Sequence, residues 1–141
     1  MAVYELIYSS VLESEEPMLD RLQALLYEHS VCDRDARDFM LAVSEAFTNA
    51  LLHGNRCQPN KEIKVLIDIN QKVLCADVID QGRGGADKVK KKCPSSLLSE
   101  GGRGVDLMRY CSTDVKFVED EKGDLTVSIR LERQDDRQFN K

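Results

Sequence analysis

One glycine-rich segment of this chain has the residue types of an anion-binding site. Gly101-Gly102-Arg103-Gly104 runs directly into a predicted helix. Exposed backbone N–H groups and the positive end of the helix dipole at such a junction favour a bound anion. The segment has neither the GxxxxGK[ST] pattern of a P-loop nor the GxGxxG spacing of a dinucleotide-binding fold. Taken alone, it is weak evidence for a ligand site.

A second group of residues follows a predicted strand. Its sequence is Asp80-Gln81-Gly82-Arg83-Gly84-Gly85. Glycine lets a backbone approach a ligand closely, and the aspartate offers fixed acceptor oxygens. Ordinary turns also use Asp and Gly, so this group alone is weak evidence as well.

The third group is a row of polar residues on a predicted helix. Glu45, Asn49 and His53 are spaced at i, i+4 and i+8. At about 100° per residue they lie along one strip, roughly opposite the apolar stripe centred on Val43 and Phe47. Every amphipathic helix has a polar face, so packing alone explains this group at least as readily as function does.

Taken together and in this order, the three groups resemble the motifs of the GHKL ATPase superfamily of gyrase, histidine kinases and MutL. Residues 45–55, EAFTNALLHGN, are similar to the corresponding box of the bacterial anti-sigma-factor serine kinases. Residues 102–108, GRGVDLM, are similar to the phosphate loop of these kinases. The resemblance covers nearly the whole chain, and the short loop between the glycine motifs is similar to the lid of these kinases.

The resemblance implies roles for the polar residues. Asn49 would hold Mg2+ through its side-chain oxygen, and Glu45 would be the general base that accepts the proton of an attacking serine. Asp80 would accept a hydrogen bond from the exocyclic amine of adenine. Guanine has a carbonyl at that position, so we expect discrimination against GTP. His53 either faces the nucleotide or caps the end of the helix.

The remaining nucleotide contacts also follow from the resemblance. Gly82 and Gly84 would let the base and sugar lie against the backbone. The phosphates would be wrapped by residues of the glycine loop: Gly102, Arg103, Gly104 and Val105. Ser128 or Thr126 could assist at the adenine, and the choice between them stays open. Four lysines of the predicted lid either neutralise the triphosphate, dock an acidic partner or form a solvated basic run: Lys88, Lys90, Lys91 and Lys92.

Alternating apolar residues predict the strands that position these groups: residues 3–10, 63–69, 73–79, 114–118 and 125–131. One helix is predicted to begin at a capping Ser14, and a second to run from Asp33 to about Leu52 and end at Gly54. A short helix follows Gly104. The residues between the glycine motifs are polar and without period, and they predict a loop. The polar tail from Glu132 is expected to fray.

Composition limits the class of protein. The net charge of -5 argues against non-specific nucleic-acid binding, which needs a basic face. The five cysteines are odd in number and widely spread, which indicates reduced thiols rather than disulfides or a zinc site. The N-terminus lacks the pattern of a signal peptide, and no apolar run approaches the roughly 20 residues of a membrane span. We therefore expect a soluble, cytoplasmic protein.

The predicted elements add up to a two-layer α/β sandwich, with a mixed, largely antiparallel sheet and helices on one face. The resemblance identifies this fold as the Bergerat type. Residues 1–133 form one predicted ATP-binding kinase domain, and residues 134–141 form a polar tail. No internal repeat or linker divides the chain.

For function, the resemblance implies a serine/threonine kinase that binds ATP and Mg2+. Such a kinase phosphorylates a serine on an anti-sigma-factor antagonist and sequesters a sigma factor, and it is implied to be a homodimer. The alternative is a nucleotide-gated or nucleotide-free regulator that binds proteins but transfers nothing. A detached ATPase half of a histidine kinase is a third reading, which the short lid and the absence of a phosphoacceptor helix disfavour.

Overall fold

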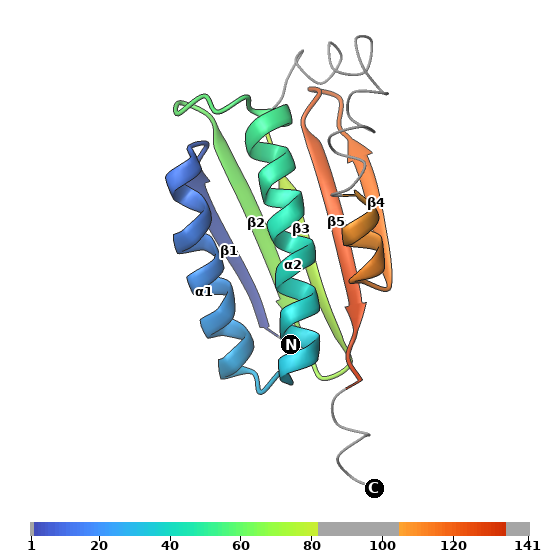
Figure 1. Ribbon diagram of the computed structural model, residues 1–141. Coiled ribbons are helices and arrows are strands. Elements are labelled where there is room, and N and C mark those ends of the chain that lie inside the picture. The colour runs from blue at the N-terminus through green and yellow to red at the C-terminus, as the bar shows by residue number, and fades with distance from the viewer. Residues whose placement is uncertain (1, 82–104, 135–141) are drawn as a thin grey trace, which may run out of the picture.

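The computed structural model describes residues 2–81 and 105–134 and forms two layers (Figure 1). One layer is a five-stranded sheet of strand order β1-β2-β3-β5-β4. Every pairing among these strands is antiparallel. The strands are β1 (Ala2–Ser9), β2 (Glu62–Ile69), β3 (Val73–Ile79), β4 (Asp114–Glu119) and β5 (Leu125–Glu132). The prediction of an α/β sandwich is confirmed, with an antiparallel sheet rather than a mixed one.

The helices form the other layer, over one face of the sheet (Figure 1). They are α1 (Glu15–Glu28), α2 (Asp33–Asn49) and a short helix at residues 105–110. A 3-10 turn, η1 (Leu12–Ser14), precedes α1, and a π-helical segment, η2 (Ala50–Gly54), continues α2. The second helical region therefore ends near the predicted residue, but its last turn is wider than that of an α-helix.

The core lies between the two layers and follows from the sequence pattern. Alternate residues of β2 and β3, among them Val65, Ile67 and Ala76, are almost fully buried because their side chains face the helices. Phe39, Phe47 and other apolar residues of the helices fill the other side of the core. Met108 of the short helix is also fully buried.

Two details of the sequence analysis are wrong. The Ser14 side chain does not cap α1, because its hydroxyl donates to the carbonyl oxygen of Ser9 at 2.7 Å. The chain does not fray at Glu132: β5 includes this residue, and the following Arg133 is buried. Arg133 donates to the backbone carbonyl of Asn70 at 2.8 Å, which ties the end of β5 to the turn between β2 and β3.

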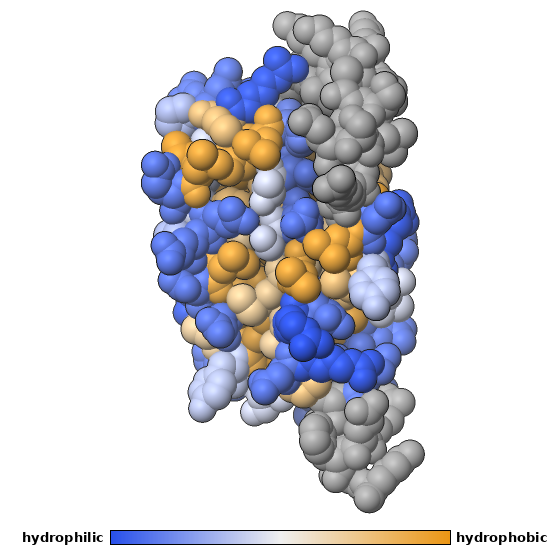
Figure 2. Space-filling model, viewed as in Figure 1, coloured by the Kyte–Doolittle hydropathy of each residue, from blue (hydrophilic) through white to orange (hydrophobic). Residues whose placement is uncertain are grey.

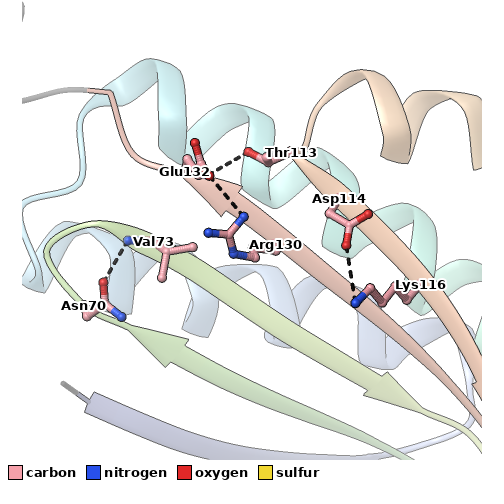
Figure 3. Close-up of polar contacts among 7 residues, drawn as sticks. All are labelled: Asn70, Val73, Thr113, Asp114, Lys116, Arg130 and Glu132. Carbon is pink, nitrogen blue, oxygen red and sulfur yellow. Dashed lines mark hydrogen bonds and ion pairs between the residues drawn. The ribbon is translucent and has the colours of Figure 1, made fainter.

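The turns and the uncovered face of the sheet carry polar contacts (Figure 3). At the β2–β3 turn, the Asn70 side chain accepts from the backbone N–H groups of Lys72 and Val73, which confirms the predicted turn. Arg130 and Glu132 form an exposed ion pair at 3.2 Å on β5. Exposed pairs of this kind contribute little stability, so the fold depends mainly on the buried face.

On the helical face, apolar side chains reach the surface between the two long helices (Figure 2). A groove of about 460 Å³ lies between α1 and α2, and its lining includes Leu19, Leu26, Met40 and Leu41. In the part of the chain that the structure describes, no helix is long and apolar enough to cross a membrane.

Candidate active site

The candidate site is centred on Asp80, immediately after β3. Asp80 is only 3% exposed, and such burial is unusual for a residue with a carboxylate side chain. The backbone N–H of Leu125 donates to Asp80 Oδ1 at 3.1 Å, and the Asp80 backbone N–H donates to the carbonyl oxygen of Leu125. The end of β3 and the start of β5 thus hold this carboxylate at a defined position.

The end of the second helical region lies beside Asp80. Gly54, the last residue of η2, is in direct contact distance of the Asp80 side chain. The next residue, Asn55, is fully buried and joins two strands. Its Oδ1 accepts from the backbone N–H of Gln81 at 2.7 Å, and its Nδ2 donates to the carbonyl oxygen of Glu62 at 2.9 Å.

Glu45 and Asn49 lie on the helix that leads to this region. Both are half-buried, and Asn49 is the last residue of α2, five residues before Gly54. His53 belongs to the π-helical segment, where hydrogen bonds run over five residues, as from Asn55 N–H to the carbonyl oxygen of Ala50. The prediction of one strip assumed α-helical geometry as far as His53, whereas residues 50–54 form a wider turn.

A contact between the two long helices sets the orientation of α2. Glu15 Oε2 accepts from Ser44 Oγ at 3.0 Å and from Thr48 Oγ1 at 3.1 Å. Ser44 and Thr48 directly precede Glu45 and Asn49 in the sequence. Because successive residues of a helix differ by about 100°, this contact fixes the direction in which the two candidate residues point.

The structure separates two predicted residues from this cluster. Ser128 and Thr126 alternate along β5 with the buried Val127 and Ile129, so their side chains lie on the uncovered face of the sheet. Asp80 lies on the helical side, beside Gly54. Near Asp80, β5 instead contributes the backbone of Leu125. A sequence does not reveal such a contact, because it does not depend on the type of side chain at position 125.

Several predicted site residues lie outside the described residues: Gly82, Gly84, Gly102, Arg103 and Gly104, together with the four lysines of the predicted lid. Val105 lies in the short helix at residues 105–110 and packs, partly buried, against the core. A helix is thus present in the described residues that follow the predicted glycine segment.

Across residues 2–81 and 105–134, no group of three or more His, Cys, Asp or Glu side chains could hold a metal ion. Mg2+ in nucleotide sites takes only one or two protein oxygens, with phosphate and water completing its shell. A single amide oxygen, such as that of Asn49, is consistent with this mode of binding.

A comparison with protein families assigns the fold. The model of the histidine kinase-like ATPase domain matches residues 8–131. The chain belongs to this family. The match includes all three predicted motifs, so the resemblance inferred from them is confirmed.

Curated relatives of this ATPase domain include transcription regulators. An anti-sigma F factor of Halalkalibacterium halodurans is 30% identical over 62% of this chain and 63% of its own length. The serine-protein kinase RsbW of Bacillus licheniformis is 34% identical over 72% of this chain and 70% of its own length. The chain thus spans less than two thirds of the first relative.

Solved structures share the fold. The RsbW and RsbU domains of a Mycobacterium tuberculosis protein superpose with a TM-score of 0.68 at 16% identity, over 95% of this chain and 34% of that one. The SiaB-SiaC complex of Pseudomonas aeruginosa gives a TM-score of 0.52 at 16% identity, over 94% of this chain and 89% of that one. At this identity the likeness establishes the fold and not the partner.

Three residues of this region, Glu15, Gly54 and Asn55, have no site role that the sequence predicts. Gly54 and Asn55 belong to the segment 45–55 that resembles the kinase motif, but the sequence indicates only a helix end at Gly54. Glu15 had no signal at all, because its partners Ser44 and Thr48 are 29 and 33 residues away in the sequence.

Proposed function

We propose that this chain binds ATP with Mg2+ and transfers the terminal phosphate to a serine of an anti-sigma-factor antagonist. The observation that carries the proposal is the buried carboxylate of Asp80, held by the Leu125 backbone N–H and beside Gly54, at the end of the helical segment that continues α2. Glu45 and Asn49 are residues of α2. The exocyclic amine of adenine is a suitable donor for a carboxylate.

The other residues have distinct roles in this proposal. Asn49 would bind Mg2+ through its side-chain oxygen, and Mg2+ would supply charge neutralisation for the triphosphate. Glu45, one turn earlier on α2, would accept the proton of the serine hydroxyl. The glycine segment before residue 105 would bind the phosphates through its backbone N–H groups. His53 would lie at the edge of the nucleotide.

Phosphorylation offers a physical basis for a partner switch. A phosphate adds nearly two negative charges to the antagonist, and this protein already carries a net charge of -5. The phosphorylated antagonist would dissociate, and the freed kinase would hold a sigma factor. The names of two relatives, an anti-sigma F factor and a serine-protein kinase, support this partner switch. The proposal further includes a cytoplasmic location, a homodimer and no direct contact with nucleic acid.

The nucleotide site is tested by equilibrium binding of ATP with and without Mg2+. We expect Asp80→Asn to weaken ATP binding by about tenfold or more, because a hydrogen bond to a charged group contributes ~1.5–3 kcal/mol. Asn49→Ala should remove the dependence on Mg2+. Absence of ATP binding by the parent chain would refute the proposal.

Phosphate transfer is tested separately, with Glu45→Ala. This variant should bind ATP normally but lose transfer to the antagonist, and acid-stable phosphoserine should be the product of the parent. Asp38→Ala removes another partly exposed carboxylate of α2 and serves as the matched control. A parent that binds ATP without transferring phosphate would favour the alternative of a nucleotide-gated binding protein.

A further inference from the structure

We infer that Gly54 is a specificity-determining position, because the Asp80 carboxylate occupies the space that a side chain at position 54 would fill. This inference rests on the proposed function, in which Asp80 recognises adenine. Gly54 itself need not touch the nucleotide. It acts through Asp80 and is therefore a positioning residue.

The contact between the two residues leaves no room for a methyl group. A Cβ atom added to Gly54 would lie 2.0 Å from Asp80 Oδ2, 2.5 Å from its Cγ and 2.9 Å from its Cβ. All three distances are shorter than nonbonded carbon and oxygen atoms tolerate. Rotation about the Cα–Cβ bond of Asp80 relieves the first two contacts only by moving the carboxylate oxygens, and it leaves the third contact in place.

Backbone conformation does not explain the glycine. Gly54 lies inside the π-helical segment, and Gly123 is the glycine with positive φ among residues 2–81 and 105–134. The left-handed conformations that follow the helix belong instead to Arg56 and Cys57, with φ of 54° and 57°. Alanine favours helical conformations more than glycine does, so the local backbone by itself would prefer alanine at position 54.

Hydrogen bonds restrict the movement of Asp80 and of the backbone next to it. The backbone N–H of Leu125 holds Oδ1, and the buried Asn55 side chain holds the backbone of the adjacent Gln81. The strand end is therefore anchored on both sides of the carboxylate. An added methyl group at position 54 must therefore displace the Asp80 carboxylate from the position that these hydrogen bonds define.

A stability cycle tests the contact without any nucleotide. Gly54→Ala should lower the urea midpoint of unfolding in the parent background. In the Asp80→Gly background, which removes all three contacting atoms, the same change should leave the midpoint unchanged or raise it. Equal losses in both backgrounds would overturn the inference, because they would mean that position 54 requires glycine for another reason.

Nucleotide selectivity tests the positioning role. Gly54→Ala should reduce ATP affinity by about tenfold and lower the ATP-to-GTP affinity ratio to that of Asp80→Asn. Arg133→Lys, a change at the opposite end of the sheet, is the control for loss of stability alone and should keep the parent ratio. A folded Gly54→Ala variant that keeps the parent ratio would overturn the inference.

The two experiments separate this inference from the proposed function. If the parent binds no ATP, the proposed function fails and takes the specificity role with it, while the stability cycle still reports the contact. If Asp80→Asn abolishes the preference for ATP and Gly54→Ala does not, the proposed function stands and the role of Gly54 fails alone.

Discussion

The two ends of the sheet both bury polar side chains, but they use them differently. At one end, which we call the latch, Arg133 donates to the backbone carbonyls of Asn70, His29 and Ser30. At the other end, the site end, Asp80 and Asn55 lie between a helix terminus and the ends of β2, β3 and β5. The two ends lie at opposite ends of α2 (Figure 1).

The difference shows that buried polarity alone does not mark a functional site. In the latch, the donors of Arg133 bind backbone carbonyls of the β2–β3 turn and of the segment between α1 and α2. At the site end, a carboxylate occupies the space beside Gly54, and the first glycine motif follows it directly in sequence. Mutations at the two ends should therefore separate stability from nucleotide binding.

The largest expected effect is the loss of stability in Arg133→Ala. Arg133 is only 9% exposed, and its removal leaves three backbone carbonyls without the donor that it supplies. We expect the free energy of unfolding to fall by about 3 kcal/mol in urea titrations. ATP affinity of the folded variant should be unchanged, and a change in affinity would contradict the separation of the two ends. Arg37→Ala, at a side chain that is 68% exposed, is the control.

Asn55→Ala should affect both properties. Its two short hydrogen bonds are lost within the core, so we expect a loss of about 2–3 kcal/mol in unfolding free energy. ATP binding should weaken as well, because the backbone beside Asp80 loses its anchor. A variant with reduced stability and full ATP affinity would show that Asn55 belongs to the fold alone.

Glu15→Gln should have a smaller effect. The amide oxygen can still accept from both hydroxyls, but the hydrogen bonds from Ser44 and Thr48 lose their charge assistance. We expect a loss of about 1 kcal/mol in unfolding free energy. Under the proposed function, the rate of phosphate transfer should fall more than ATP affinity, since the contact of Glu15 with Ser44 sets the direction of the adjacent Glu45. Equal changes in both would argue against a positioning role for Glu15.

The smallest effect concerns the uncovered face of the sheet. Burial raises the pKa of the Cys75 thiol, Asp68 and Asp77 raise it further, and Arg130 opposes them. The folded state thus favours the protonated thiol. The contribution of the protonated Cys75 thiol to the free energy of unfolding is complete below the pKa of the unfolded state. This contribution is lost as the pH rises through the pKa of the folded state. Cys75→Ser should therefore show a shallower decline of stability than the parent above about pH 8.5, measured by urea titration. Parallel declines would contradict this assignment.

Much of the fold was predictable because its elements follow local rules. The alternation in residues 63–69 and 125–131 identified buried strands, and the apolar stripe around Val43 and Phe47 identified a helix. The π-helical turn at residues 50–54 was not predictable, because helical periodicity is too coarse to distinguish one wider turn. The role of Arg133 was missed for a different reason, since its partners are more than 60 residues away.

The sequence by itself determined the family, the order of the elements and the residues Glu45, Asn49 and Asp80 as a candidate set. These depend on residue type, short spacings and period, which a single sequence contains. Only the tertiary structure decided that Gly54 meets Asp80 and that Asn55 holds the adjacent Gln81. It also decided that Glu15 contacts α2, and that Ser128 and Thr126 lie on the other face of the sheet. Such contacts join residues far apart in the chain, and strand register and helix rotation set them through packing of the whole core.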